Sequence, residues 1–182
     1  MMKLVLFLVL TIPLVLVSRR SLFKVKKHGL YRFITWECAL WLAIENLLLA
    51  TTEPKGLWYL VASGLTLGSL IIVVVALVTM QRHGQVSRQR HDETLFAFEK
   101  TTELVSTGLF RYIRHPMYTS LLCLIWGLYL RQPQSLLLVV AVFGSLSCIA
   151  AALIEERENL EFFGDSYREY MHSTRRFIPF VF

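Results

Sequence analysis

The chain alternates between long apolar runs and short polar segments. Apolar residues dominate 1–17, 30–50, 57–80, 117–130 and 135–154. A helix of about 20 apolar residues spans the hydrocarbon core of a bilayer, so only the run at 117–130 is short for a span. Arg131 follows that run, and a long basic side chain can extend its reach to the interface. The pattern predicts an all-α, polytopic membrane helix bundle with about five transmembrane helices.

The first apolar run has a second interpretation, a secretory signal peptide. The residues that follow it are Ser18-Arg19-Arg20, without the small residues of a cleavage site. This favours a first membrane helix, in which Pro13 is the expected position of a kink.

The last two apolar runs are separated only by Gln132-Pro133-Gln134, so we expect them to form a tight helical hairpin. Pro116 suits the first turn of the first hairpin helix, which places His115 at its mouth. Glu155 and Glu156 follow the second run, and the hairpin would return them to the same membrane face. Imidazole and carboxylates would then meet there, an arrangement that is typical of a cofactor site.

Two earlier runs contain residues that are unusual at membrane depth. Glu37 and Glu45 lie in the second run, where carboxylates are costly and usually face a cavity or another helix. They either line a substrate cavity or bond to neighbouring helices. Gly64 and Gly68 lie four apart in the third run, which favours close helix approach. We expect that pair to pack inside this bundle rather than to form a dimer.

Composition and charge support the membrane assignment. The chain has 182 residues, of which 55% are hydrophobic and 18% charged, and its mean hydropathy is +0.53. A soluble domain carries about 25% charged residues. The net charge of +6 invites a nucleic-acid interpretation, but the bases lie beside the apolar runs, as membrane topology requires, so we expect no nucleic-acid partner.

The basic residues also predict an orientation. With five spans, only Lys3, Lys55 and Arg131 of the 19 Lys and Arg residues fall on one side of the membrane. The positive-inside rule makes the other side cytoplasmic, so the N-terminus is expected outside and the C-terminus and the pocket in the cytoplasm.

We expect one membrane domain over 1–182, with three transmembrane helices in 1–80 and a cofactor-binding region with the hairpin in 81–182. We expect the long polar segment 81–107 to be solvated or interfacial and not a metal site, although its length is typical of functional loops. The tail 175–180 mixes bases and aromatic residues, which suits an anionic membrane surface. Three cysteines, Cys38, Cys123 and Cys148, lie in apolar runs and are expected to be buried, with no metal site.

Several motifs of the C-terminal half occur together: 104–110, Arg114-His115-Pro116-Met117-Tyr118, Glu155-Glu156, 163–170 and Ile178-Pro179. In order and spacing they resemble the isoprenylcysteine carboxyl methyltransferase family, whose relatives methylate phospholipids and other lipophilic acceptors. The resemblance implies S-adenosylmethionine as the donor, bound on the cytoplasmic side. The cofactor-binding residues that it implies are Thr102, Glu103, Leu104, Val105, Phe110, His115, Pro116, Met117, Tyr118 and Glu155.

The chain departs from that family at three places. The family usually has a histidine at the position of Thr102 and a tyrosine at that of Phe110. It also carries a substrate-contacting arginine three or four residues before the glutamate pair, where this chain has Ala151 and Ala152.

The activity implied by the resemblance is methyl transfer to a lipophilic small molecule or lipidated acceptor that enters from the bilayer lipids. Isoprenylcysteine carboxylate O-methylation is the family activity, and a phospholipid or another lipophilic amine, thiol or phenol is the alternative acceptor. A carboxylate needs no base, whereas the alternatives do, and Glu156 is the candidate catalytic residue if burial makes it a stronger base. Two other functions remain open, a nicotinamide-dependent membrane reductase and a non-enzymatic scaffold or transporter.

Overall fold

The computed structural model describes residues 1–48, 56–84 and 104–179. Within these ranges the chain forms α-helices and one short 3-10 helix, η2, but no strand. The elements are α1 (Met2–Ser18), α2 (His28–Leu48), α3 (Gly56–His83), η2 (Gly108–Arg111), α4 (Pro116–Arg131), α5 (Ser135–Phe163) and α6 (Asp165–Ser173). The predicted all-α class is confirmed for this part of the chain.

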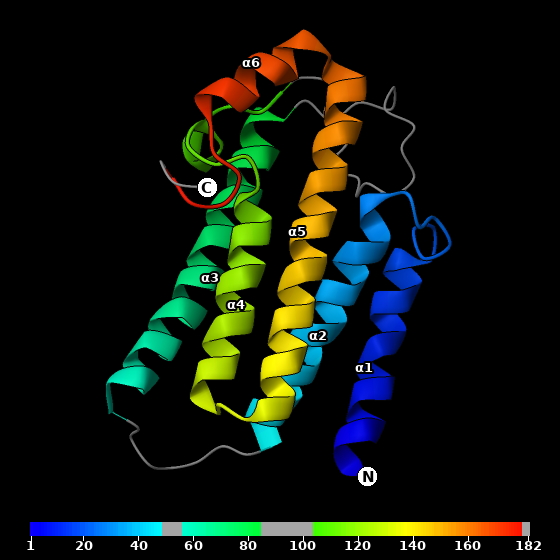
Figure 1. Ribbon diagram of the computed structural model, residues 1–182, viewed down its shortest axis with the longest axis vertical. Helices are drawn as coiled ribbons and strands as arrows, with labels where there is room; N and C mark the ends of the chain where they lie inside the picture. The colour runs from blue at the N-terminus through cyan, green and yellow to red at the C-terminus, as the bar shows by residue number, and fades with distance from the viewer. Residues whose placement is uncertain (49–55, 85–103, 180–182) are drawn as a thin grey trace.

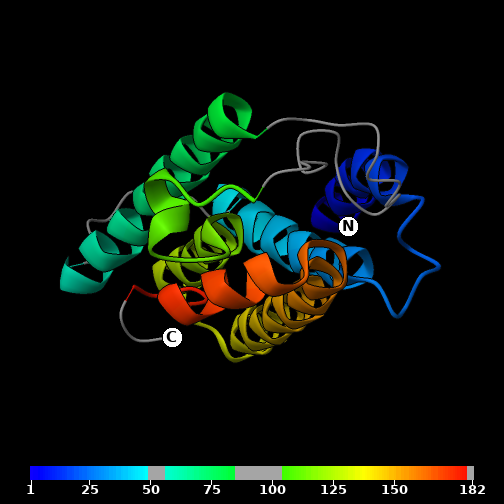
Figure 2. The same cartoon turned by 90° about the horizontal axis from the view of Figure 1, so that it is seen from above.

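Helices α1 to α5 lie side by side, and each runs opposite to the one before it (Figure 1). The N-terminus and the turn between α4 and α5 lie at one end of the bundle, whereas α6 crosses the other end. Seen from above, α4 lies between α3 and α5, and α1 lies at the edge beside α2 (Figure 2). The most extensive contacts join α3 to α4 and α2 to α5.

The hairpin is confirmed, because α4 and α5 are joined by the three residues 132–134. Helix α5 is longer than the apolar run that predicted it, and it continues past Ile154 to Phe163. Glu155 and Glu156 therefore sit on a rigid helix and do not belong to a polar loop.

Two glycines let the helices approach closely. A Cβ added at Gly127 of α4 would lie 2.6 Å from Thr66 Oγ1 on α3, and one at Gly144 of α5 would lie 2.8 Å from Cys38 Cβ on α2. The pair predicted to pack inside the bundle does not pack against the described helices, because a Cβ at Gly64 or Gly68 would meet no described residue within 4 Å. These two glycines lie on a part of α3 that faces away from the other described helices.

The two glutamates of α2 bond to α1. Thr11 Oγ1 donates to Glu37 Oε2 at 2.6 Å, and Lys3 Nζ lies 2.6 Å from Glu45 Oε2. This supports the interpretation in which both carboxylates bond to a neighbouring helix. Glu37 also lines a second, apolar cavity beside Trp41.

Two described helices, α3 and α5, are long and apolar enough to cross a membrane, and α1 is a shorter apolar helix. Large apolar side chains of α3, such as Leu67, Leu70 and Ile71, are exposed on the outside of the bundle. Such surface is unfavourable in water and suits lipid.

Candidate functional site

A cavity of about 380 Å³ lies between α2, α3, α4 and α5, near the start of α4. Its volume falls in the range of small-molecule sites, about 300–1,000 Å³. The lining is mainly apolar with a few polar groups, a combination that is typical of such sites. It comprises Arg32, Trp36, Val73, Leu77, Met80, Phe110, Arg114, His115, Pro116, Met117, Tyr118, Ser120, Leu121 and Glu155.

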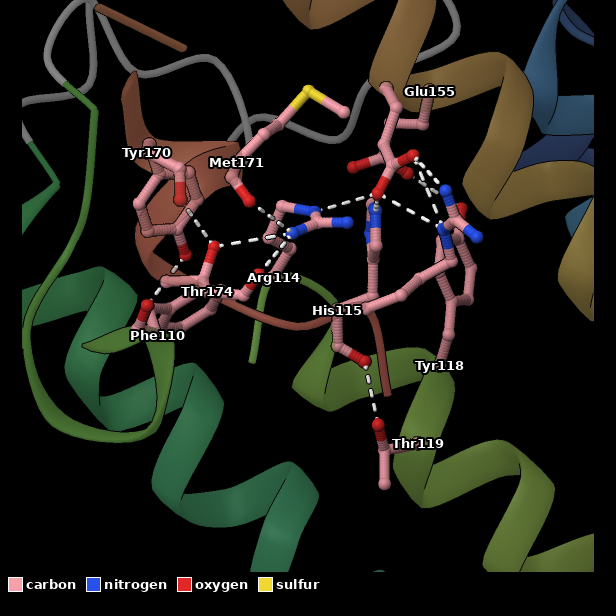
Figure 3. Close-up of polar contacts among 11 residues, drawn as sticks. Phe110, Arg114, His115, Tyr118, Thr119, Glu155, Tyr170, Met171 and Thr174 are labelled. Carbon is pink, nitrogen blue, oxygen red and sulfur yellow. Dashed lines mark hydrogen bonds and ion pairs between the residues drawn. The ribbon is translucent and has the colours of Figure 1, made fainter. Parts of the chain in front are cut away.

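The hairpin brings polar groups from its two arms together at the cavity. Pro116 occupies the first turn of α4 and His115 is its N-cap residue, as predicted from the sequence. One turn further, the hydroxyl of Tyr118 donates a 2.7 Å hydrogen bond to Glu155 Oε2 on α5 (Figure 3). The His115 ring lies 5.5 Å from the Tyr118 ring, and its Nε2 is buried without a hydrogen-bond partner among the described residues. The structure thus brings the imidazole and the carboxylate together as predicted, and it adds the Tyr118 phenol between them.

The neighbouring carboxylate, Glu156, is bound by two guanidinium groups. Arg114 Nε donates to Glu156 Oε1 at 2.7 Å, and Arg176 Nη2 donates to Glu156 Oε2 at 2.7 Å. His115 Nε2 lies 3.5 Å from Glu156 Oε1. Two adjacent positive charges stabilise the ionised carboxylate of Glu156 and so weaken its affinity for a proton. The predicted base role required burial to strengthen that affinity, and the structure does not meet this requirement.

Arg114 joins this cluster to the last turn of α6 and to the residue that follows the helix. Its Nη1 donates to the carbonyl oxygens of Thr174, at 2.6 Å, and Met171, at 3.2 Å (Figure 3). The hydroxyl of Tyr170 donates to the carbonyl oxygen of Phe110 at 2.6 Å. Burial raises the pKa of Tyr170, so the phenol stays a neutral donor at physiological pH.

The C-terminal segment pairs with the backbone that precedes α4. Ile113 and Arg175 form a parallel β-bridge, and the carbonyl oxygen of Arg176 accepts from His115 N at 3.1 Å. Thr119 Oγ1 donates to the carbonyl oxygen of Phe177 at 3.0 Å, and Phe177 is buried. The expectation that this tail lies on a membrane surface is therefore wrong for Arg176 and Phe177, because both turn inward to hold the start of α4.

Gly108 allows the backbone that precedes α4 to pass close to α3. Gly108 begins η2 with φ +60, a conformation that favours glycine. A Cβ there would lie 3.0 Å from Thr79 Oγ1 on α3. The close approach places Phe110 against Ala76 and Met80 of α3.

The wall opposite the hairpin residues comes from α2. The Cζ atom of Arg32 lies 5.4 Å from the centre of the Trp36 ring, one turn further along the helix. Such a contact contributes about 0.5–2 kcal/mol, more as the pair is desolvated. The start of α2 is fixed to α5, since His28 Nδ1 lies 2.6 Å from Glu158 Oε2.

Six of the ten predicted cofactor-binding residues line the cavity: Phe110, His115, Pro116, Met117, Tyr118 and Glu155. Leu104 and Val105 do not line it, and Val105 packs instead against the cluster around Phe110. Thr102 and Glu103 lie outside the described residues. The predicted catalytic residue, Glu156, is not in the lining.

The sequence reasoning missed the part of the lining that comes from α2 and α3. A signal for Arg32 was present, because a charged residue inside an apolar run usually faces a bundle interior or a cavity. The predictions applied that argument to the glutamates of the same run and not to the arginine.

In a comparison with protein families, residues 57–166 match the family described as phospholipid methyltransferase. Comparison with curated proteins found no match, nor did comparison with solved structures. The matched residues include α3, η2, α4 and α5 with the Tyr118–Glu155 pair, whereas Arg32 and Trp36 lie outside the match.

Proposed function

The chain belongs to the phospholipid methyltransferase family and is a membrane methyltransferase, and we propose that it uses S-adenosylmethionine to methylate a lipophilic acceptor held in the cavity. The observation that carries the proposal is the hydrogen bond between Tyr118 and Glu155, which fixes a carboxylate on the cavity wall.

The residues present fit this donor. S-Adenosylmethionine carries an ammonium group, a carboxylate, an adenine ring and a positive sulfonium. Glu155 would pair with the ammonium group, and His115 lines the same cavity beside Tyr118. Leu77, Met80 and Met117 supply apolar surface for the adenine.

When bound, the donor supplies an electrophilic methyl group that is transferred by in-line displacement. The protein contributes mainly by positioning, which is worth up to about 7–11 kcal/mol in favourable cases. Tyr118 holds the Glu155 carboxylate in one orientation, and the apolar lining excludes water from the reacting groups.

We assign Glu156 a positioning role in place of the base role suggested by the sequence. Its ion pairs tie Arg114, which precedes the cavity residue His115, to Arg176 of the C-terminal segment. Loss of Glu156 would therefore loosen the residues that begin α4.

The acceptor that we propose is a membrane lipid. The family match favours a phospholipid, and isoprenylcysteine carboxylate is the competing acceptor. The exposed apolar surface of α3 beside the cavity suits an acceptor that arrives through the bilayer.

We also propose five spans, with the N-terminus outside and the cavity and C-terminus in the cytoplasm. The alternating helix directions of Figure 1 support this order. Cysteine labelling in sealed vesicles tests it: Gln134→Cys should react from outside and Arg168→Cys only from the cytoplasmic side. Reaction of both from one side would contradict the topology.

Labelled methyl transfer tests the function. The full chain, purified in detergent, is supplied with radiolabelled S-adenosylmethionine and either phosphatidylethanolamine or a farnesylated cysteine. We expect label in the phospholipid and a loss of at least about tenfold in Glu155→Gln. Label in the farnesylated cysteine alone would change the acceptor, and label in neither, without donor binding, would refute the function.

A further inference from the structure

A cavity that the proposed function does not use lies at the end of the bundle opposite the donor site. It has a volume of about 430 Å³ and lies between the start of α3 and the end of α4. Its lining includes Trp58, Tyr59, Leu130, Arg131 and Pro133, and we call it the Arg131 cavity. Helix α4 has 16 residues and rises about 1.5 Å per residue, so it separates this cavity from the donor site by about 24 Å.

The charge of Arg131 has no anionic partner within the described part of the chain. Its Cζ atom lies 5.6 Å from the centre of the Tyr59 ring, and its Nε is buried without a hydrogen-bond partner among the described residues. The proposed topology places Lys3 on the same side of the membrane, and Lys3 is already bound to Glu45 at 2.6 Å. A partly buried charge is costly unless it is paired. The Arg131 cavity therefore favours an anionic ligand.

The aromatic residues of the cavity indicate the level of the lipid head groups. Trp58 and Tyr59 lie in the first turn of α3, and both side chains are exposed. Tryptophan and tyrosine concentrate at the membrane–water interface, where their rings lie beside the head groups. Leu57 and Leu60 of the same helix are also exposed and offer apolar surface to acyl chains. A free anion would use the charge alone, whereas an anionic lipid would use both the charge and this surface.

We propose that the Arg131 cavity binds the phosphate group of a membrane phospholipid. The planar guanidinium suits this group, because its donors match phosphate oxygens in pairs. The Tyr59 ring holds the guanidinium in place by a cation–π contact. The cavity joins α3 to α4, so a bound lipid would strengthen their contact at this end of the bundle. The site goes beyond the proposed function, because its lipid lies too far from the donor site to be the methyl acceptor.

Lipid binding to the full chain in a neutral maltoside micelle tests this site. Didecanoylphosphatidylglycerol carries the phosphate and the acyl chains, didecanoylglycerol lacks the phosphate, and inorganic phosphate lacks the chains. Native mass spectrometry over a titration measures the apparent Kd of each lipid. We expect the phospholipid to bind at least about tenfold more tightly than didecanoylglycerol. Millimolar inorganic phosphate should not displace it.

Arg131→Gln should weaken phospholipid binding by at least about tenfold, and Arg131→Lys should retain part of it, because lysine keeps the charge but loses the paired donors. Arg168→Gln is the matched control, since Arg168 forms an exposed ion pair with Asp165 on α6, at the other end of the bundle. It should bind the phospholipid as the parent does. Lipid bound elsewhere contributes equally to all these proteins. Melting temperatures without lipid show that the variants fold, and added phospholipid should raise that of the parent more than that of Arg131→Gln.

Equal binding of didecanoylphosphatidylglycerol and didecanoylglycerol by the parent would overturn the phosphate site, and so would equal phospholipid binding by the parent and Arg131→Gln. Displacement of the phospholipid by inorganic phosphate would show that the cavity takes a free anion, which would overturn a lipid as its ligand. The comparison within the parent holds even if a variant does not fold. None of these measurements includes the methyl donor, so failure of this site leaves the proposed function intact.

Discussion

The hydroxyl of Tyr118 and the carboxylate of Glu155 come from the two arms of one hairpin and meet at 2.7 Å. The bond closes the open end of the hairpin, where both residues line the same cavity. It fixes the distance between the start of α4 and the polar end of α5.

Tyr118→Phe should weaken S-adenosylhomocysteine binding by about tenfold or more. The variant keeps the buried ring but leaves the Glu155 carboxylate without its hydroxyl donor, and hydrogen bonds to charged groups contribute about 1.5–3 kcal/mol. Isothermal titration of purified protein measures the effect. Tyr129→Phe is the control, because Tyr129 packs on Trp126 away from the cavity, and equal losses in both variants would contradict the assignment.

Glu156→Gln should lower thermal stability as well as activity. Arg114 and Arg176 would lose their shared carboxylate, and removing one partner of a buried ion pair costs about 3–5 kcal/mol. The melting temperature in detergent measures this loss. A variant that is inactive yet as stable as its parent would restore the base hypothesis. Asp165→Asn removes an exposed ion pair and should leave the melting temperature unchanged.

Arg176→Gln and Arg175→Gln compare an inward-facing with an outward-facing side chain of the C-terminal segment. Arg176 binds Glu156, and its loss should cost about 1–2 kcal/mol, discounted because its side chain is partly exposed. Arg175 makes its contacts through backbone hydrogen bonds, and its side chain is exposed. The melting temperature of Arg175→Gln should therefore equal that of the parent. Equal melting temperatures of the two variants would show that the Arg176 side chain does not stabilise the start of α4.

Gly127→Ala should destabilise the bundle by about 1–3 kcal/mol, since the new methyl group would overlap Thr66. Gly64→Ala provides the matched change on an open face and should be neutral or slightly stabilising. Melting temperatures of both variants in the same detergent make the comparison. Destabilisation by Gly64→Ala in a dilute micelle would indicate an unseen helix contact at that face.

The sequence predicted the helical hairpin well because two strong local signals coincide there. Pro116 marks the beginning of one helix, and the turn at 132–134 is so short that the two helices it joins must be antiparallel neighbours. Helix lengths alone set Tyr118 level with Cys148, whose Sγ lies 3.7 Å from the Tyr118 carbonyl oxygen, so the contact with Glu155 depends on how the two side chains reach along the helices. The six predicted cofactor residues that line the cavity were implied by the family resemblance, and the hairpin brings them together.

The parts that sequence could not supply depend on long-range contacts. The charge of Arg32 inside an apolar run indicates a buried position, but nothing local shows which charged residue of that run reaches the cavity, because this depends on how α2 packs on α5. Likewise, the partners of Glu156 lie at 114 and 176, and only the fold brings them together. The spacing of Gly64 and Gly68 indicated close packing, but spacing does not say which face meets a neighbour.

Calorimetric titration of S-adenosylhomocysteine into the full chain and into Glu155→Gln tests the central claim most directly. The claim is that the carboxylate held by Tyr118 binds the amino group of the methyl donor. The parent protein should bind one molecule per chain, and Glu155→Gln should bind at least about tenfold more weakly at an unchanged melting temperature. Equal binding by both proteins, or no binding by the parent, would contradict it.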